Sequence, residues 1–119
     1  MPLLTIHELS LMMALGERVL EAAALEQAER VVAIHLRVGR LAGVDVIALR
    51  TAAEVVLEGT LADGAHLAIE EVPPAWWCVP CQEEFTALND LGRCPRCGHF
   101  SRQLLRGRDL SLHALDLEP

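Results

Sequence analysis

The chain has 119 residues and a formal net charge of −7, with 52% hydrophobic and 3% aromatic residues. This length suits one compact domain, or a small domain that carries a metal-stabilised module. The negative charge disfavours general binding to polyphosphate. The few aromatic residues disfavour a protein that binds single-stranded nucleic acid by stacking on its bases. No apolar run approaches the ~20 residues needed to span a bilayer.

Two helices are predicted in the first half of the chain. Apolar residues recur with helical period over 8–28 and predict the first helix. Its expected buried face consists of Leu9, Met12, Met13, Gly16, Val19, Leu20 and Ala23. Thr5 and Glu8 have the spacing of a capping box, so Thr5 is expected to cap this helix. A second helix is predicted over about 46–58, with Asp45 as its N-cap.

Alternating apolar residues predict three strands, over 31–38, about 65–72 and about 108–117. The first strand is expected to turn one set of side chains to the core: Val32, Ile34, Leu36 and Val38. The alternation of the last strand slips near His113 and Ala114, which indicates a bulge. A lone strand is not stable by itself, so the last strand should return to the sheet of the other two. The sequence therefore predicts an α/β (α+β) fold with a small three-stranded sheet and two helices.

Four cysteines follow the spacing Cys78-x2-Cys81-x12-Cys94-x2-Cys97. Each pair can present two thiolates to one ion, and the linker allows the second pair to fold back opposite the first. The product is a tetrahedral S4 cage, the arrangement that structural zinc prefers. Such a cage has no open coordination position and is expected to hold structure without performing chemistry. A thioredoxin-like redox pair is disfavoured, because it needs one Cys-x-x-Cys at a helix N-terminus.

The cysteines lie in a segment that is expected to be inserted into the α/β domain. Pro73-Pro74 ends the second strand, and Gly107 precedes the third. We therefore expect a zinc-ribbon-like module over 74–107, within a domain made of 1–73 and 108–119. A site this small has no core of its own. Its expected cover is aromatic: Trp76, Trp77 and Phe85.

Five of the ten arginines fall between Arg93 and Arg108. One interpretation is a phosphate-binding patch, as in nucleic-acid-binding zinc ribbons. The other is compensation of four thiolates around one dication, together with solvated strand positions. The acidity of the whole chain favours compensation. A zinc-ribbon module that binds nucleic acid remains the alternative function.

Several short motifs together carry a resemblance to a known family. They are His7-Glu8-Leu9-Ser10, Val38-Gly39-Arg40-Leu41 followed by Val44 and an acid, Glu58-Gly59-Thr60-Leu61, the cysteine spacing, and a closing strand from Asp109-Leu110 to Leu117-Glu118. In this order they cover nearly the whole chain. The chain resembles the HypA/HybF family of hydrogenase maturation proteins, which are nickel metallochaperones.

The resemblance implies two metal sites with different roles. Zinc (Zn2+) is structural and is held by the cysteine cage, whereas nickel (Ni2+) is a transient cargo that binds at the start of the first helix. The family's nickel-binding histidine corresponds to His7, with Glu8 as a supporting ligand and Asp45 near the same site. Imidazole nitrogen, backbone nitrogen and carboxylate oxygen together form a donor set that Ni(II) accepts.

One feature departs from the family pattern. Family members typically begin Met-His-Glu, so their terminal amine lies beside the histidine and can bind nickel. Here Met1–Thr5 precede Ile6-His7, which displaces the amine by six residues. Three alternatives follow. The extension folds back so that the amine reaches the site, or His7 binds nickel with backbone amides and acids alone, or the nickel site is weaker or degenerate and the chain is a structural adaptor.

The resemblance also implies partners: a GTPase of the HypB type and the precursor of the hydrogenase large subunit, with urease maturation as a further role. The zinc module is a natural docking surface, which substitution of Arg102 or Glu83 would test. A monomer or a homodimer is expected, and neither nucleic acid nor a membrane is expected as a partner.

We expect no enzymatic activity and a cytoplasmic location. The sequence has no paired nucleophile and base, and no glycine-rich phosphate loop. Its N-terminus lacks the features of a signal peptide. One cage uses all four cysteines, which suits a reducing compartment.

Overall fold

The computed structural model describes residues 6–86 and 92–119, and side chains from His7 onward. The chain folds into two compact units. Unit 1 comprises Met1–Leu36, Val44–Ile69 and Leu112–Pro119, and unit 2 comprises Arg37–Gly43 and Glu70–Ser111. Unit 2 contains the whole of the predicted insertion, 74–107, and extends beyond it on both sides. The limits of the zinc-binding domain at 74 and 107 remain a prediction.

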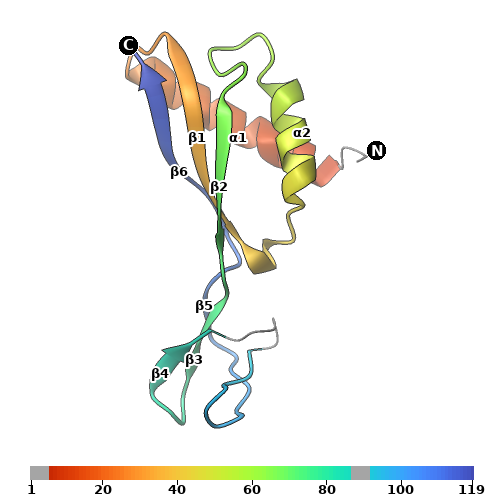
Figure 1. Cartoon of the computed structure of the whole chain (residues 1–119), viewed down its shortest axis with the longest axis vertical. Coiled ribbons are helices and arrows are strands. Elements are labelled where there is room, and N and C mark those ends of the chain that lie inside the picture. The colour runs from red at the N-terminus through yellow and green to blue at the C-terminus, as the bar shows by residue number, and fades with distance from the viewer. Residues whose placement is uncertain (1–5, 87–91) are drawn as a thin grey trace. The chain divides into compact units, whose positions relative to one another are not determined.

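The main sheet has three strands and is accompanied by two helices, as the sequence predicted. Its strand order is β2-β1-β6, with β1 (Arg30–Gly39) between β2 (His66–Val72) and β6 (Leu110–Glu118). The last strand therefore does return to the sheet of the first two. Helix α1 (Ile6–Leu25) lies behind this sheet in Figure 1, and α2 (Val46–Val56) packs against α1.

Helix α1 ends three residues earlier than the periodicity predicts. Its C-terminus is closed by backbone hydrogen bonds from Gln27 N to Ala24 O (3.0 Å) and from Ala28 N to Ala23 O (3.0 Å). Gln27 takes a left-handed conformation, with φ of 55°. Glycine usually occupies such a position, so the end of the helix could not be recognised from the residue type. The predicted cap, Thr5, lies outside the described residues.

The buried face of α1 differs in part from the predicted one. Met12, Val19 and Ala23 are fully buried, as expected, but Met13 is 55% exposed and Leu15 is buried in its place. Gly16 lies at the crossing with α2, because a Cβ at this position would stand 3.3 Å from Val56 Cγ1. Leu15 directly precedes Gly16, on the part of α1 that packs against α2, and it is buried there, whereas Met13 is exposed.

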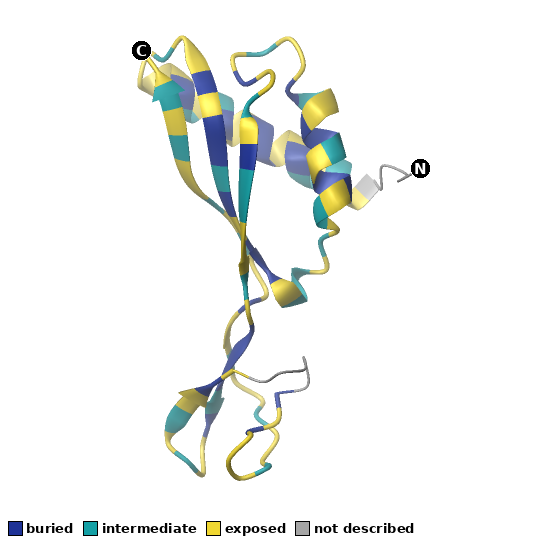
Figure 2. Ribbon diagram, viewed as in Figure 1, coloured by how far each residue is buried: buried dark blue, intermediate teal, exposed yellow. Residues whose placement is uncertain are grey.

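The central strand β1 supplies much of the core of unit 1, shown in dark blue in Figure 2. Ile34 and Leu36 are buried as predicted, and so is Val38, which already belongs to unit 2. The expected phase is wrong at the start of the strand, because Val32 is 41% exposed and Val31 is fully buried. On β6 the burial alternation slips between two consecutive exposed residues, His113 and Ala114. This is the position where the sequence predicts a bulge.

Helix α2 begins where the sequence predicts. The Asp45 carboxylate accepts a hydrogen bond from Ala48 N at 3.1 Å and so caps the helix. The Arg50 side chain donates to the Leu67 carbonyl at 2.5 Å, which ties α2 to β2. In the described part of the chain, neither helix is long and apolar enough to cross a membrane.

Unit 2 contains a second sheet, whose strands were not predicted from the sequence. Its order is β4-β3-β5, formed by β3 (Ala75–Cys78), β4 (Glu83–Phe85) and β5 (Leu104–Arg106), all antiparallel. A short 3-10 helix, η1 (Arg40–Ala42), follows β1 and belongs to the same unit. The strands β3, β4 and β5 are too short for the periodicity of side chains to reveal them.

A close backbone approach explains one glycine of the Val38–Leu41 motif. Gly39 N donates to Asp109 O at 2.8 Å, and Leu41 N donates to Gly107 O at 2.7 Å. A Cβ on Gly39 would overlap the backbone of Gly107. Gly39 has an ordinary φ of −65°, so lack of space, and not backbone conformation, requires glycine here.

We therefore expect Gly39→Ala to lower the free energy of unfolding by about 3 kcal/mol, at the upper end of the cost of overpacking. Gly43→Ala is the matched control, because Gly43 has a φ of 71° and open space around its Cα. That change should cost only about 1 kcal/mol, for the left-handed backbone. Urea unfolding of both variants measures the difference, and equal losses would contradict the close approach.

Candidate metal centres

The first cysteine pair is held by the hairpin between β3 and β4. Cys78 is the last residue of β3 and is fully buried, and Cys81 lies in the turn that follows. Gln82 closes the turn: its φ is 54°, and its Nε2 donates to the Val79 carbonyl at 2.7 Å. The turn thus directs both sulfur atoms to the same side.

The second pair is held by an equivalent turn. Gly98 N donates to Cys94 O at 2.9 Å, and Cys94 N donates to His99 O at 2.8 Å. Gly98 has a φ of 76°, so the residue after the second cysteine is left-handed in both turns. The match between the two turns explains how a paired Cys-x-x-Cys sequence forms one site from two similar halves.

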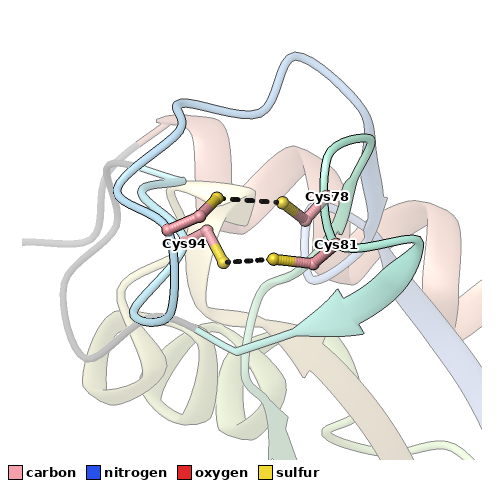
Figure 3. Close-up of side chains that lie close together, drawn as sticks. Cys78, Cys81 and Cys94 are labelled. Atoms are coloured by element: carbon pink, nitrogen blue, oxygen red, sulfur yellow. Dashed lines mark hydrogen bonds between the residues drawn. The ribbon is translucent and has the colours of Figure 1, made fainter.

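The four sulfur atoms form one cluster, within 4.8 Å of one another. Cys78 Sγ lies 3.5 Å from Cys97 Sγ, and Cys81 Sγ lies 3.9 Å from Cys94 Sγ. A tetrahedral zinc site with Zn–S bonds of about 2.3 Å has S–S edges of about 3.8 Å, whereas a disulfide has an S–S length of about 2.0 Å. Figure 3 shows Cys78 and Cys81 facing Cys94 across the space between them. The cage therefore fits a structural zinc site.

The cage forms much of the small core of unit 2. Trp76 stacks on Phe85, with ring centroids 5.9 Å apart and an interplanar angle of 17°. These two rings pack with Cys78 and Cys94, and three partly buried side chains join them: Leu41, Cys81 and Leu104. Two of the three predicted aromatic residues thus cover the cage. The contribution of Leu41 was missed, although Leu41 is an apolar residue of the Val38–Leu41 motif.

The protein environment alone does not ionise all four thiols. Burial raises the pKa of Cys78, and hydrogen bonding with the Cys97 thiol raises the pKa of Cys81 to about 12. A hydrogen bond from the backbone amide of Cys97 lowers the pKa of Cys94 to about 7. Because a thiol must lose its proton to bind a metal, loading the cage releases protons, and metal affinity rises with pH.

The predicted nickel ligands lie in unit 1, at the starts of its two helices. The His7 side chain is 58% exposed, and its Nε2 stands 3.9 Å from Oε2 of Glu8, whose side chain is only 5% exposed. The Asp45 carboxylate is engaged as the cap of α2. Among the described residues, only the four cysteines bring three or more potential ligand atoms within 4.8 Å of one another, so His7, Glu8 and Asp45 do not form a closed cluster.

Comparison with known proteins decides the family. Residues 6–117 match the HypA family, described as "Hydrogenase/urease nickel incorporation, metallochaperone, hypA". The chain belongs to the HypA family. The match begins at Ile6, directly before the His-Glu-Leu-Ser motif, and includes all four cysteines.

Relatives within the HypA family cover nearly the whole chain. A hydrogenase maturation factor HypA from Chloroflexus aurantiacus is 44% identical over 111 residues, which span 92% of this chain and 97% of the relative. One from Azotobacter chroococcum mcd 1 is 37% identical over 112 residues, spanning 94% and 99%. Both relatives are described as hydrogenase maturation factors.

The fold of the HypA family is also that of this chain. The solution structure of the Ni metallochaperone HypA from Helicobacter pylori aligns with a TM-score of 0.68 over 93% of this chain and 97% of that one, at 23% identity. A second solution structure of a HypA protein aligns with a TM-score of 0.71. At this identity the likeness concerns the fold, which agrees with the predicted α+β class.

Proposed function

We propose that this chain is a nickel metallochaperone that supplies Ni(II) during maturation of nickel–iron hydrogenase. The observation that carries the proposal is the HypA family match, which spans both the His7-Glu8 motif and the complete cysteine cage. The chain acts by binding and releasing an ion, and we propose no catalysed reaction.

We propose that zinc is the resident ion of the cage. The donor set is four cysteine sulfurs at tetrahedral spacing, which suits Zn2+ and leaves no position open for a substrate. When bound, the ion cross-links the two turns and favours the deprotonated form of all four cysteines. This role is structural, and nickel does not pass through it.

We propose that nickel binds at the start of α1, chiefly through the imidazole of His7. This side chain is exposed, so an arriving ion can reach its ring nitrogens. The neighbouring Glu8 carboxylate is buried, and burial of its negative charge favours a cation beside it. An incomplete set of nitrogen and oxygen donors holds Ni(II) weakly enough for release.

Asp45 is the weakest of the proposed nickel ligands. Its Oδ1 accepts the hydrogen bond that caps α2, so binding a metal through that atom would cost the helix its cap, worth about 1 kcal/mol. We therefore rank Asp45 behind Glu8 as a supporting ligand.

The proposed partners are a GTPase of the HypB type, which would drive nickel transfer, and the large-subunit precursor of a hydrogenase. The family description names urease nickel incorporation as well, so a urease is a further proposed recipient. Partners of this kind and reduced cysteines in the cage are consistent with a cytoplasmic location.

The nucleic-acid alternative gains no support from the arginine cluster. Arg96 forms an ion pair with Glu83, and Arg106 forms one with Glu84. Two of the five arginines are therefore neutralised within the module. The acidity of the whole chain opposes binding to a polyanion as well.

The test is genetic complementation of a bacterium that lacks its own HypA. The wild-type chain is expected to restore hydrogenase activity, and His7→Ala is expected to restore little unless excess nickel is supplied. His66→Ala is the matched control, because His66 is exposed in the same unit and carries no proposed metal role. Full activity with His7→Ala at low nickel would refute the proposed cargo site.

A further inference from the structure

Unit 2 carries an open groove that the metal cage does not use. The groove has a volume of about 560 Å³ and lies between the end of β3 and the segment 99–103. Its apolar lining comes from Trp77, Val79 and Phe100, and its polar lining includes His99 and Arg102. None of these five residues is a cysteine of the cage or a proposed nickel ligand.

The apolar lining of the groove is unusually exposed for so small a unit. Val79 is 52% exposed and Phe100 is 58% exposed. Trp76 and Trp77 are consecutive on β3, and consecutive strand residues point to opposite faces. Trp76 is buried on the cage side, and Trp77 lines the groove. The prediction that both tryptophans cover the cage is therefore wrong for Trp77.

The groove is held in a fixed shape by hydrogen bonds across it. Ser101 Oγ donates to the Trp77 carbonyl at 2.6 Å, and Trp77 N donates to the Gln103 carbonyl at 3.0 Å. Phe100 pairs with Arg93 across a β-bridge, and the Arg93 guanidinium stands 5.8 Å from the centroid of the Phe100 ring. A preformed groove loses little conformational entropy when a ligand binds.

The arginines beside the groove form no ion pair with a carboxylate in the described part of the chain. Among the described residues, Glu83 and Glu84 pair with Arg96 and Arg106, and no carboxylate pairs with Arg93, His99 or Arg102. Unit 1 contains eleven acidic residues and three arginines, whereas unit 2 contains six acidic residues and seven arginines. Unit 1 has a net charge of −8, whereas unit 2 has +1 from these side chains and −1 once four thiolates and one Zn2+ are counted, so any attraction of an anion to unit 2 is local to its arginines.

We propose that this groove binds an acidic segment of a partner protein, with a bulky apolar side chain against Trp77, Val79 and Phe100 and carboxylates beside Arg93 and Arg102. Trp, Arg and an apolar centre with a polar rim are typical of binding hot spots. The local charge supplies the specificity, because an acidic segment is repelled by unit 1 and attracted to Arg102 in the groove and to Arg93 on the Phe100 ring.

The experiment is titration of the zinc-loaded full chain, without nickel, into a fluorescently labelled acetyl-Glu-Asp-Leu-Phe-Glu-Asp-amide peptide. We expect saturable binding that weakens as the salt concentration rises from about 50 mM to about 500 mM. Arg102→Glu and Phe100→Ser should each weaken binding about tenfold. The matched controls are Arg108→Glu and Leu105→Ser, exposed residues of the same unit that do not line the groove, and they should change affinity by less than about twofold.

Measured zinc content establishes that each variant keeps its cage. Absence of binding by the wild-type chain, or equal weakening in groove and control variants, would overturn the proposal. So would equal or tighter binding of the corresponding Lys-Arg-Leu-Phe-Lys-Arg peptide or of a single-stranded oligonucleotide. Because no nickel is present, failure here leaves the proposed metal delivery intact, and loss of nickel binding leaves this result unaffected.

Discussion

Removing zinc from the cage is expected to unfold unit 2 and to leave the helices of unit 1 folded. Two of the four buried members of its core cluster, Cys78 and Cys94, are proposed ligands, and the strands β3, β4 and β5 have four, three and three residues. So small a core cannot offset the entropy of ordering the chain without a cross-link. Structural zinc supplies an apparent binding free energy of about 10 kcal/mol or more near neutral pH.

The measurement is tryptophan fluorescence and far-UV circular dichroism during chelation. Trp76 is buried against Phe85, so its emission should shift to longer wavelength as zinc leaves, while the helical signal of α1 and α2 persists. Cys78→Ser should reproduce this state without a chelator. His99→Ala, next to the second cysteine turn, should keep both zinc and the native emission. An unchanged emission after complete zinc removal would show that the metal does not hold unit 2 together.

Replacement of His7 by alanine is expected to abolish nickel binding and to leave zinc binding unchanged. Calorimetric titration of NiCl2 into the zinc-loaded wild-type chain should reveal one site in the micromolar range. The site should disappear in His7→Ala, because the exposed His7 imidazole is its proposed principal ligand. His66→Ala, the matched control, should bind nickel as the wild type does.

Substitution of Glu8, the neighbouring carboxylate, tests whether nickel binds at the start of α1 or elsewhere in the chain. Glu8→Gln keeps the shape of the buried side chain and removes its charge, so nickel affinity should fall roughly tenfold, as for groups that support a metal ligand. Unchanged nickel affinity in both His7→Ala and Glu8→Gln would show that the start of α1 is not the cargo site.

The fold was largely predictable because its longer elements have clear periodicity. The pattern over 8–28 revealed α1, and Asp45 marked the first turn of α2. The errors have local causes. Gln27 closes α1 with a left-handed backbone that normally indicates glycine. Helix α2 packs against α1 at Gly16, beside the buried Leu15, and a single sequence does not contain that tertiary contact.

The cage was predictable because cysteine spacing fixes ligand geometry locally. Each Cys-x-x-Cys turn forms its half of the site by itself, as Gln82 and Gly98 show. The proposed nickel site depends on two segments far apart in sequence, near His7 and near Asp45. The number of residues between them does not predict how far apart they lie in the folded chain. The groove at Phe100 was missed for a similar reason, because only the folded strand shows that Trp77 points away from the cage.

X-ray absorption at the nickel and zinc edges of the chain loaded with both metals tests most directly whether each ion has its own ligands. The expected zinc spectrum has four sulfur neighbours at about 2.3 Å, and the expected nickel spectrum has only nitrogen and oxygen neighbours, including imidazole. His7→Ala should remove the nickel signal and leave the zinc spectrum as it is. Sulfur neighbours around nickel, or zinc displaced by nickel, would contradict the separation of a permanent ion from a transported one.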